Sequence, residues 1–213
     1  IKHKKTITEL KKKYKNFFCF QGNISSLIFL KKFIKLTKIK IDILFNCAVE
    51  RSDLHPGGKI DSKKWQSIIS KNSTALYVST LFFSEIMKKN KEGGSVIIVS
   101  SIYGIKIPDL SIYKNTKSFT PIDYPFLKAG SILLTKYFAK LYGKYNLRFN
   151  IMAPGGLDDS HMNPTLKRNY LKKTQIKRLL NSNDIKFLSL FLASDKSSYI
   201  TGEVIKVDGG YCL

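Results

Sequence analysis

The sequence predicts one domain of the doubly wound α/β class, in which a parallel sheet lies between two layers of helices. Segments with helical periodicity alternate with short apolar runs along the 213 residues, which is the pattern of repeated strand–helix units. The run Ser-Val-Ile-Ile-Val-Ser at 95–100 is typical of a parallel strand that is buried on both faces. The length suits a single domain over residues 1–213 with a sizeable core.

The individual elements follow from the spacing of apolar residues. Helices are expected at residues 6–13, 27–36, 62–89, 125–142 and 183–193. Asp61 or Ser62 is the expected N-terminal cap of the longest helix, because a short polar side chain there can accept a free backbone N–H. Strands are expected at residues 17–20, 41–45, 95–100, 147–152 and 203–207, and residues 156–180 form a variable segment.

Composition argues against several classes of protein. No stretch of about 18 apolar residues predicts a membrane span, and no leader with a cleavage site indicates secretion. The three cysteines, Cys19, Cys47 and Cys212, are odd in number and far apart. We therefore expect reduced thiols in a cytoplasmic protein. The three histidines have no metal-ligand spacing, so no metal site is expected.

The net charge of +22 raises the question of nucleic-acid binding. A basic patch can bind phosphates by releasing their counterions. Here the lysines are spread over nearly all segments, and no nucleic-acid motif accompanies them. We interpret the charge as solvated surface charge and expect no nucleic-acid partner.

Tyr124 and Lys128 form the most informative pair, four residues apart at the start of a long amphipathic segment. Residues i and i+4 share one helix face, so the ammonium can favour the ionised phenol and prepare it for proton transfer. Pro125 suits the first position of that helix. Tyr113 and Lys117 have the same spacing, but Pro121 follows them and rules out a helix of comparable length.

Five motifs occur in an order that identifies a known family. They are Leu-Phe-Asn-Cys-Ala at 44–48, Val-Ser-Ser-Ile-Tyr-Gly at 99–104, Tyr-x-x-x-Lys at 124–128, Asn-x-x-x-Pro-Gly at 150–155, and Ser-Tyr-Ile-Thr-Gly at 198–202 with Val-Asp-Gly-Gly at 207–210. With them the chain resembles the short-chain dehydrogenase/reductase family over nearly its whole length. The resemblance implies a Rossmann-like three-layer αβα fold, NAD or NADP as cofactor, and a homo-oligomer, commonly a tetramer.

The resemblance also implies catalytic roles. Tyr124 would be the general acid/base, and Lys128 would lower its pKa and bind the nicotinamide ribose. Ser101 would hydrogen-bond the substrate carbonyl; Ser100 is its rival, but the Ser-x-x-Gly spacing selects Ser101. Asn72 matches the helix asparagine that holds a proton-relay water.

Cofactor contacts are implied in the same way. The positions are Asn23, Asn46, Ala48, Tyr124, Lys128, Pro154, Gly155 and Leu157. The chain departs from the family pattern at Cys47, where the family has Asn, and at Val49, where it has Gly. A third departure is Asp159, where many relatives have Thr. Val49 bears on how closely the backbone can approach the cofactor. Asp159 bears on the contact with the nicotinamide carboxamide.

The family's glycine-rich turn, Thr-Gly-x-x-x-Gly-x-Gly, is not found in the sequence. That turn holds the pyrophosphate at a helix N-terminus. The chain opens on what resembles the family's second helix, so we expect an N-terminally truncated domain lacking about two strands and the helix between them. The residues that distinguish NAD from NADP lie in that part, and its loss would separate strand 17–20 from the rest of the sheet and leave an unpaired edge.

Residues 156–180 correspond to the family's substrate lid. Six cations lie there against Asp158 and Asp159: Lys167, Arg168, Lys172, Lys173, Lys177 and Arg178. They favour an anionic substrate such as a sugar phosphate or nucleotide sugar. A solvated helix face in a basic chain is an equal alternative.

Three hypotheses of function follow. The first is an NAD(P)-dependent oxidoreductase that interconverts an alcohol and a ketone on a carbohydrate or nucleotide sugar, because the motifs look most like sugar-pathway members linked to flagellin and surface-glycan modification. The second is a 3-oxoacyl-thioester reductase, which the same catalytic residues permit. The third is a truncated, cofactor-free homologue or interaction subunit.

Overall fold

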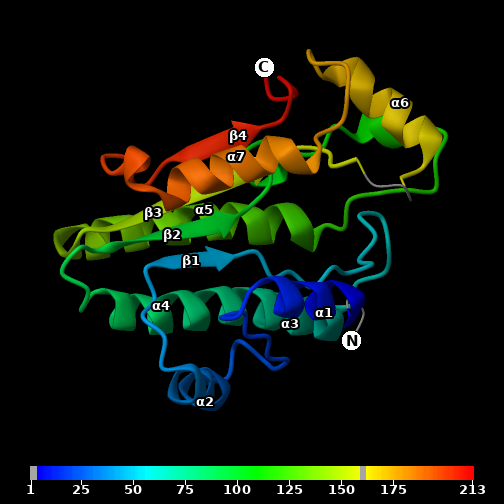
Figure 1. Ribbon diagram of the computed structural model, residues 1–213. Coiled ribbons are helices and arrows are strands. Elements are labelled where there is room, and N and C mark those ends of the chain that lie inside the picture. Colours follow the sequence, from blue (N-terminus) through cyan, green and yellow to red (C-terminus); the bar gives the residue numbers. More distant parts are fainter. Residues whose placement is uncertain (1–3, 159–161) are drawn as a thin grey trace.

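The computed structural model describes residues 4–158 and 162–213, and it has one parallel four-stranded sheet (Figure 1). The strand order is β1-β2-β3-β4, and every neighbouring pair is parallel. The strands are β1 (Ile43–Asn46), β2 (Gly94–Val99), β3 (Leu147–Pro154) and β4 (Val204–Val207). The expected doubly wound α/β class is confirmed.

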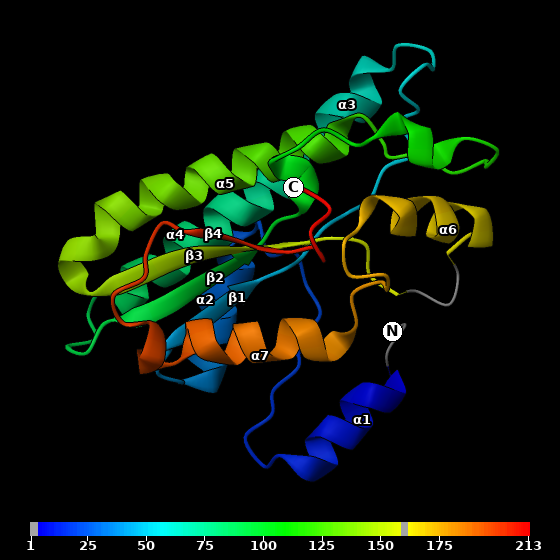
Figure 2. The same cartoon turned by 90° about the horizontal axis from the view of Figure 1, so that it is seen from above.

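Helices cover both faces of the sheet (Figure 2). On one face lie α4 (Ala75–Met87) and α5 (Asp123–Tyr142), and on the other lies α7 (Ser182–Ala193). A π-helical stretch, Ser70–Thr74, joins α3 (Ser62–Ile69) to α4. The remaining α-helices are α1 (Lys4–Lys13), α2 (Leu27–Thr37) and α6 (Pro164–Lys173). None of the helices in the described ranges is long and apolar enough to span a bilayer.

The side chains of β2 alternate between two cores. Val96 and Ile98 pack with residues of α4 and α5, including Met87 and Phe138. Ile97 joins a second core with Leu192 of α7. Both faces of β2 are therefore buried, which explains why its sequence is continuously apolar rather than alternating.

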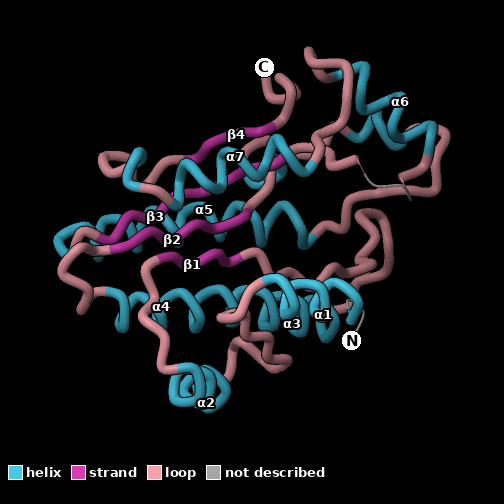
Figure 3. Tube along the Cα trace, viewed as in Figure 1, coloured by secondary structure: helices cyan, strands magenta, loops and turns pink. Residues whose placement is uncertain are grey.

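The predicted strand at residues 17–20 is wrong, because this segment is loop (Figure 3). A strand needs a neighbour for its backbone N–H and C=O groups, and no described strand lies beside residues 17–20. The segment instead contacts α2, with the ring of Phe20 packing edge-on against that of Phe33 at 5.3 Å. On β1, which is an edge strand, Ile43 and Phe45 are correspondingly exposed.

Two helix boundaries also differ from expectation. Asp61 is the cap of α3 and accepts a hydrogen bond from the Lys64 N–H at 2.9 Å, as predicted. The predicted helix 62–89 contains the π-helical stretch and ends at Met87. The helix α5 begins at Asp123, so Pro125 is its third residue rather than its first. Proline is tolerated there because the N–H groups of the first turn have no partner within the helix.

Candidate active site

Ser101 and Tyr124 lie in the wall of one cavity of about 470 Å³. Ser101 follows β2 at its carboxyl end, and its hydroxyl accepts a hydrogen bond from the Tyr103 N–H at 3.2 Å, which starts the 3-10 turn Ile102–Gly104. Tyr124 lies in the first turn of α5. The two hydroxyl-bearing side chains predicted to meet the substrate oxygen therefore share one cavity.

Gly104 allows the turn after β2 to approach α5 closely. A Cβ atom at this position would lie 2.7 Å from the carbonyl oxygen of Lys128. Any side chain would push the turn away from the helix, because contacts under 3 Å between such atoms are repulsive. Glycine here sets the spacing between Ser101 and the Tyr124–Lys128 face of α5.

Lys128 is buried beside Tyr124. Its Nζ lies 5.6 Å from the centre of the Tyr124 ring and donates to the carbonyl oxygen of Val99 at 3.0 Å. Burial lowers the pKa of Lys128 to about 8; the nearby Cys47 acts against this, and the positive charge of Arg51 adds to it. The predicted neighbourhood of phenol and ammonium is present.

Ser100 and Ser101 face different surroundings. The Ser100 hydroxyl donates to the carbonyl oxygen of Lys128 at 2.9 Å and accepts from Ser131 at 3.0 Å. It thereby ties β2 to α5. Ser101 lines the cavity, so its position is compatible with the role predicted for it.

Tyr113 also lines this cavity, a point that spacing in the sequence did not indicate. Its hydroxyl is hydrogen-bonded to that of Thr120. Lys117 is exposed and makes no contact with the Tyr113 ring in the described structure, whereas Lys128 lies over Tyr124. Tyr113 and Tyr124 therefore both line the cavity, and they differ in whether a lysine ammonium lies over the ring.

A second cavity, of about 240 Å³, is lined by four more of the predicted site residues. Asn46, Ala48, Asn72 and Lys128 line it at the carboxyl ends of β1 and β2. The amide nitrogen of Asn46 donates to the hydroxyls of Ser79 at 2.8 Å and Thr80 at 3.2 Å, so it anchors β1 to α4.

Asn72 lies in the π-helical stretch between α3 and α4. Its amide nitrogen donates to the carbonyl oxygens of Glu50 and Ile68, both at 3.0 Å, and its oxygen accepts from the Glu50 N–H at 2.9 Å. The side chain therefore fixes the loop after β1. The sequence carried no signal for the π-helical geometry, which is frequent at functional sites.

The remaining predicted cofactor contacts are dispersed. Gly155 and Leu157 line the larger cavity, and Pro154 ends β3 beside Val207. Asn23 lies in the turn before α2, where its oxygen accepts from Ser25, and it lines neither cavity. Asp159 lies outside the described residues.

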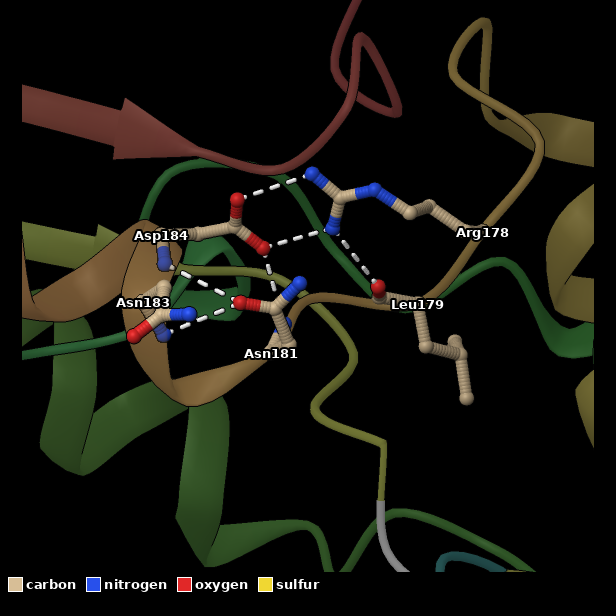
Figure 4. A network of polar contacts seen from close by, with 5 residues as sticks. All are labelled: Arg178, Leu179, Asn181, Asn183 and Asp184. Atoms are coloured by element: carbon tan, nitrogen blue, oxygen red, sulfur yellow. Dashed lines mark hydrogen bonds and ion pairs between the residues drawn. The ribbon is translucent and has the colours of Figure 1, made fainter.

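The lid cations do not form the wall of the larger cavity. Three have carboxylate partners: Lys167 with Asp158, Lys173 with Asp109, and Arg178 with Asp184. Figure 4 shows Arg178 bound to both oxygens of Asp184, at 2.6 and 2.8 Å. Of all six cations, none is among the described residues that line the cavity. The structure therefore gives no support to the expectation that these cations meet the substrate.

The sequence reading missed a polar connection at the cavity. Asp123, immediately before Tyr124, is buried and accepts a hydrogen bond from the hydroxyl of Ser52. Arg51 and Ser52 both line the cavity. The sequence shows an Asp beside the tyrosine predicted to be catalytic, but the partner of that Asp lies 71 residues away along the chain.

The smaller cavity is lined in part by Lys128. It opens where ligands bind in doubly wound sheets, at the carboxyl ends of parallel strands. The Lys128 ammonium has three donors, and Val99 is its one hydrogen-bond acceptor among the described residues. Donors therefore remain for ribose hydroxyls.

No group of three metal-ligating side chains occurs within 4–158 and 162–213.

Fold and site together define a class: an α/β protein that gathers a tyrosine, a lysine and a serine at the carboxyl edge of a parallel sheet. Residues 1–212 match the family model described as "Enoyl-(Acyl carrier protein) reductase". The chain belongs to the short-chain dehydrogenase/reductase family, whose members are NAD(P)-dependent oxidoreductases.

Individual relatives point in two directions. Over 175 residues the chain is 36% identical to the 3-oxoacyl-[acyl-carrier-protein] reductase FabG of Chlamydia pneumoniae, covering 80% of this chain and 65% of that protein. It is 35% identical over 125 residues to the post-translational flagellin modification protein A of Campylobacter coli, covering 59% of this chain and 48% of that protein. The expected likeness to flagellin-modification enzymes is thus found beside relatives named as 3-oxoacyl reductases.

A solved structure matches over most of the fold. The short chain dehydrogenase of Leptospira borgpetersenii with bound NAD+ superposes with a TM-score of 0.82 at 27% identity, covering 91% of this chain and 75% of that one. The chain spans less than two thirds of the length of the curated FabG relatives from Chlamydia pneumoniae and Chlamydia trachomatis, at 65% and 58%.

Proposed function

We propose that this protein is a 3-oxoacyl-thioester reductase that uses a reduced nicotinamide cofactor. The observation that carries the proposal is the apolar wall of the larger cavity around Ser101 and Tyr124. The apolar members of that wall include Ile102, Ile112, Phe119, Met162 and Leu166. Such a surface suits an acyl chain, because removal of apolar groups from water is favourable by about 25 cal/mol per Å² before the entropic cost of binding.

A sugar is a poorer match for the same wall. Sugar hydroxyls lose free energy on burial unless each finds a hydrogen-bond partner. Many polar groups of the wall already have partners within the protein. The pairs are Tyr113 with Thr120, Tyr170 with the Gly156 N–H, Ser52 with Asp123, and Asp53 with Lys64.

The reaction assigns one task to each residue. The nicotinamide supplies hydride when it is bound. Ser101 donates a hydrogen bond to the 3-oxo oxygen, and Tyr124 gives its phenolic proton to that oxygen. Lys128 keeps positive charge beside the phenol and donates to the ribose. NAD is the cofactor we favour, since the Leptospira relative holds NAD+.

The test compares substrates on the chain as it stands. Purified protein is given NADH or NADPH with a 3-oxoacyl thioester or with a 4-keto nucleotide sugar, and loss of the reduced nicotinamide is followed. We expect turnover of the thioester alone. Turnover of the sugar alone would overturn the proposal in favour of the activity suggested by the flagellin-modification relative.

A fluorescence titration with NADH and NADPH tests the cofactor separately. Saturable binding is expected because the smaller cavity lies at the carboxyl ends of β1 and β2 and is lined in part by Lys128. If neither nucleotide binds, the chain is a cofactor-free homologue and the proposed reduction is wrong for it.

A further inference from the structure

We propose that Arg51 is a specificity residue, which binds a phosphate or carboxylate on the substrate at the mouth of the larger cavity. The inference rests on the proposed function, because it concerns the same substrate whose ketone meets Ser101 and Tyr124. Nothing in the motifs pointed to Arg51. The proposal is based on the charged residues of the cavity wall, the hydrogen bonds of the loop that carries Arg51, and the electrostatic effect of Arg51 on Lys128.

The wall of the larger cavity carries an unbalanced charge. Arg51 and Asp53 are the charged residues among the described members of the wall. Asp53 is ion-paired with Lys64. Arg51 is exposed and has no carboxylate partner in the described part of the chain. The cavity therefore presents one uncompensated positive charge, and it belongs to Arg51.

The loop that carries Arg51 is tied down on both sides. Before it, the Glu50 N–H donates to Asn72 at 2.9 Å. After it, Ser52 donates to the buried Asp123, and the carbonyl oxygen of Leu54 accepts from the Ile122 N–H at 3.2 Å. The bond from Ser52 joins the loop to Asp123, the residue that precedes Tyr124. A substrate anion at Arg51 would thus be held in a set position relative to the catalytic phenol.

Electrostatics links Arg51 to the chemistry. Its charge contributes to the lowered pKa of Lys128, so its field reaches the catalytic pair. A guanidinium presents a planar fork of donors that matches carboxylate and phosphate oxygens. The lid cations offer no rival within the cavity, because none of them lines it among the described residues.

The experiment measures binding, so it does not depend on turnover. Three 3-oxooctanoyl thioesters are titrated calorimetrically into the chain without cofactor: the neutral thioester of N-acetylcysteamine, that of 2-mercaptoethyl phosphate and that of 3-mercaptopropionate. We expect at least one charged thioester to bind about 10-fold more tightly than the neutral one. Preference for phosphate or for carboxylate identifies the group that Arg51 takes.

Variants then test the residue. Arg51→Gln should abolish the preference while changing the dissociation constant of the neutral thioester less than about 2-fold, and Arg51→Lys should restore part of it. The matched control is Lys172→Gln, which removes a charge from α6 outside the cavity wall.

The inference is overturned if Arg51→Gln keeps the preference, if Lys172→Gln loses it equally, or if no thioester binds. Its failure is separate from that of the proposed function. A preference that depends on Arg51 without any reduction would contradict the reductase assignment alone, whereas reduction of all three thioesters without a preference would contradict only the role of Arg51.

Discussion

At the residue scale, Tyr113 and Tyr124, two of the tyrosines that line the larger cavity, differ in what surrounds their hydroxyls. Tyr124 lies beside the buried Lys128, while Tyr113 is hydrogen-bonded to Thr120. We predict that Tyr124→Phe lowers kcat of the thioester reduction by at least about 100-fold, the usual contribution of a general acid. Tyr113→Phe should retain most of the activity, and equal losses in the two variants would contradict the choice of Tyr124.

The buried ammonium of Lys128 predicts a pH dependence of stability. Its pKa is lowered from 10.5 to about 8 in the folded chain, so between these values the unfolded chain binds more protons. Stability should therefore rise from pH 8 towards 10.5, by about 3 kcal/mol at most. Denaturant unfolding of wild type and Lys128→Met measures this, because the variant lacks that part of the rise.

Lys136→Met is the matched control for that measurement. Lys136 lies on the same helix and is exposed. Its removal should leave the difference in unfolding free energy between pH 8 and pH 10 unchanged. If Lys128→Met and wild type show the same dependence, the ammonium is not buried as described.

At the scale of elements, Tyr170 connects the helix α6 to the rest of the fold. Its hydroxyl accepts from the Gly156 N–H at 2.6 Å, and its ring stacks on Tyr211 at 4.6 Å. A Cβ atom at Gly156 would come within 2.9 Å of that ring. One side chain from α6 is thus packed against both the turn after β3 and the C-terminal segment.

We predict that Tyr170→Phe destabilises the fold by about 1–3 kcal/mol, since it leaves the Gly156 N–H without a partner. The variant keeps the ring that stacks on Tyr211. We expect KM of the thioester to rise more than kcat falls. Unfolding in urea and steady-state kinetics measure the two effects. The control, Tyr199→Phe, changes a fully exposed hydroxyl and should alter neither.

At the scale of the whole molecule, α1 stands apart from the layers of the fold (Figure 2). The sheet, α4, α5 and α7 share the buried cores, whereas the described residues of α1 are mostly exposed. Segments with few buried contacts open most readily. We expect trypsin to cleave first within residues 11–15, which contain four lysines.

Deleting residues 1–13 tests the same point thermodynamically. The loss should change Tm by less than about 2 °C, because the described residues of α1 bury little apolar area. Mass spectrometry of the tryptic fragments and thermal unfolding of the deletion variant provide the measurements. A large drop in Tm would mean that α1 packs on the core.

Much of this architecture follows from local patterns. The spacing of apolar residues identifies several elements without knowledge of their neighbours in the fold, namely the helices α2, α5 and α7 and the strands β2 and β3. Tyr124 and Lys128 are neighbours because residues four apart share one face of a helix. The segment 17–20 shows the limit of such patterns. Its apolar residues allowed a strand, but a strand forms only where a neighbour supplies the other half of its hydrogen bonds.

Local patterns were enough to establish the fold class, most of the strands and helices around the sheet, and the pairing of a phenol with a lysine, because each depends on residues a few positions apart. Tertiary structure alone decided which groups share a cavity with that phenol. It brought Ser52 to Asp123 and left Arg51 exposed in the cavity wall, while the lid cations stayed outside the wall. Contacts between residues distant along the chain form only when the packing of the sheet and its helices brings them together.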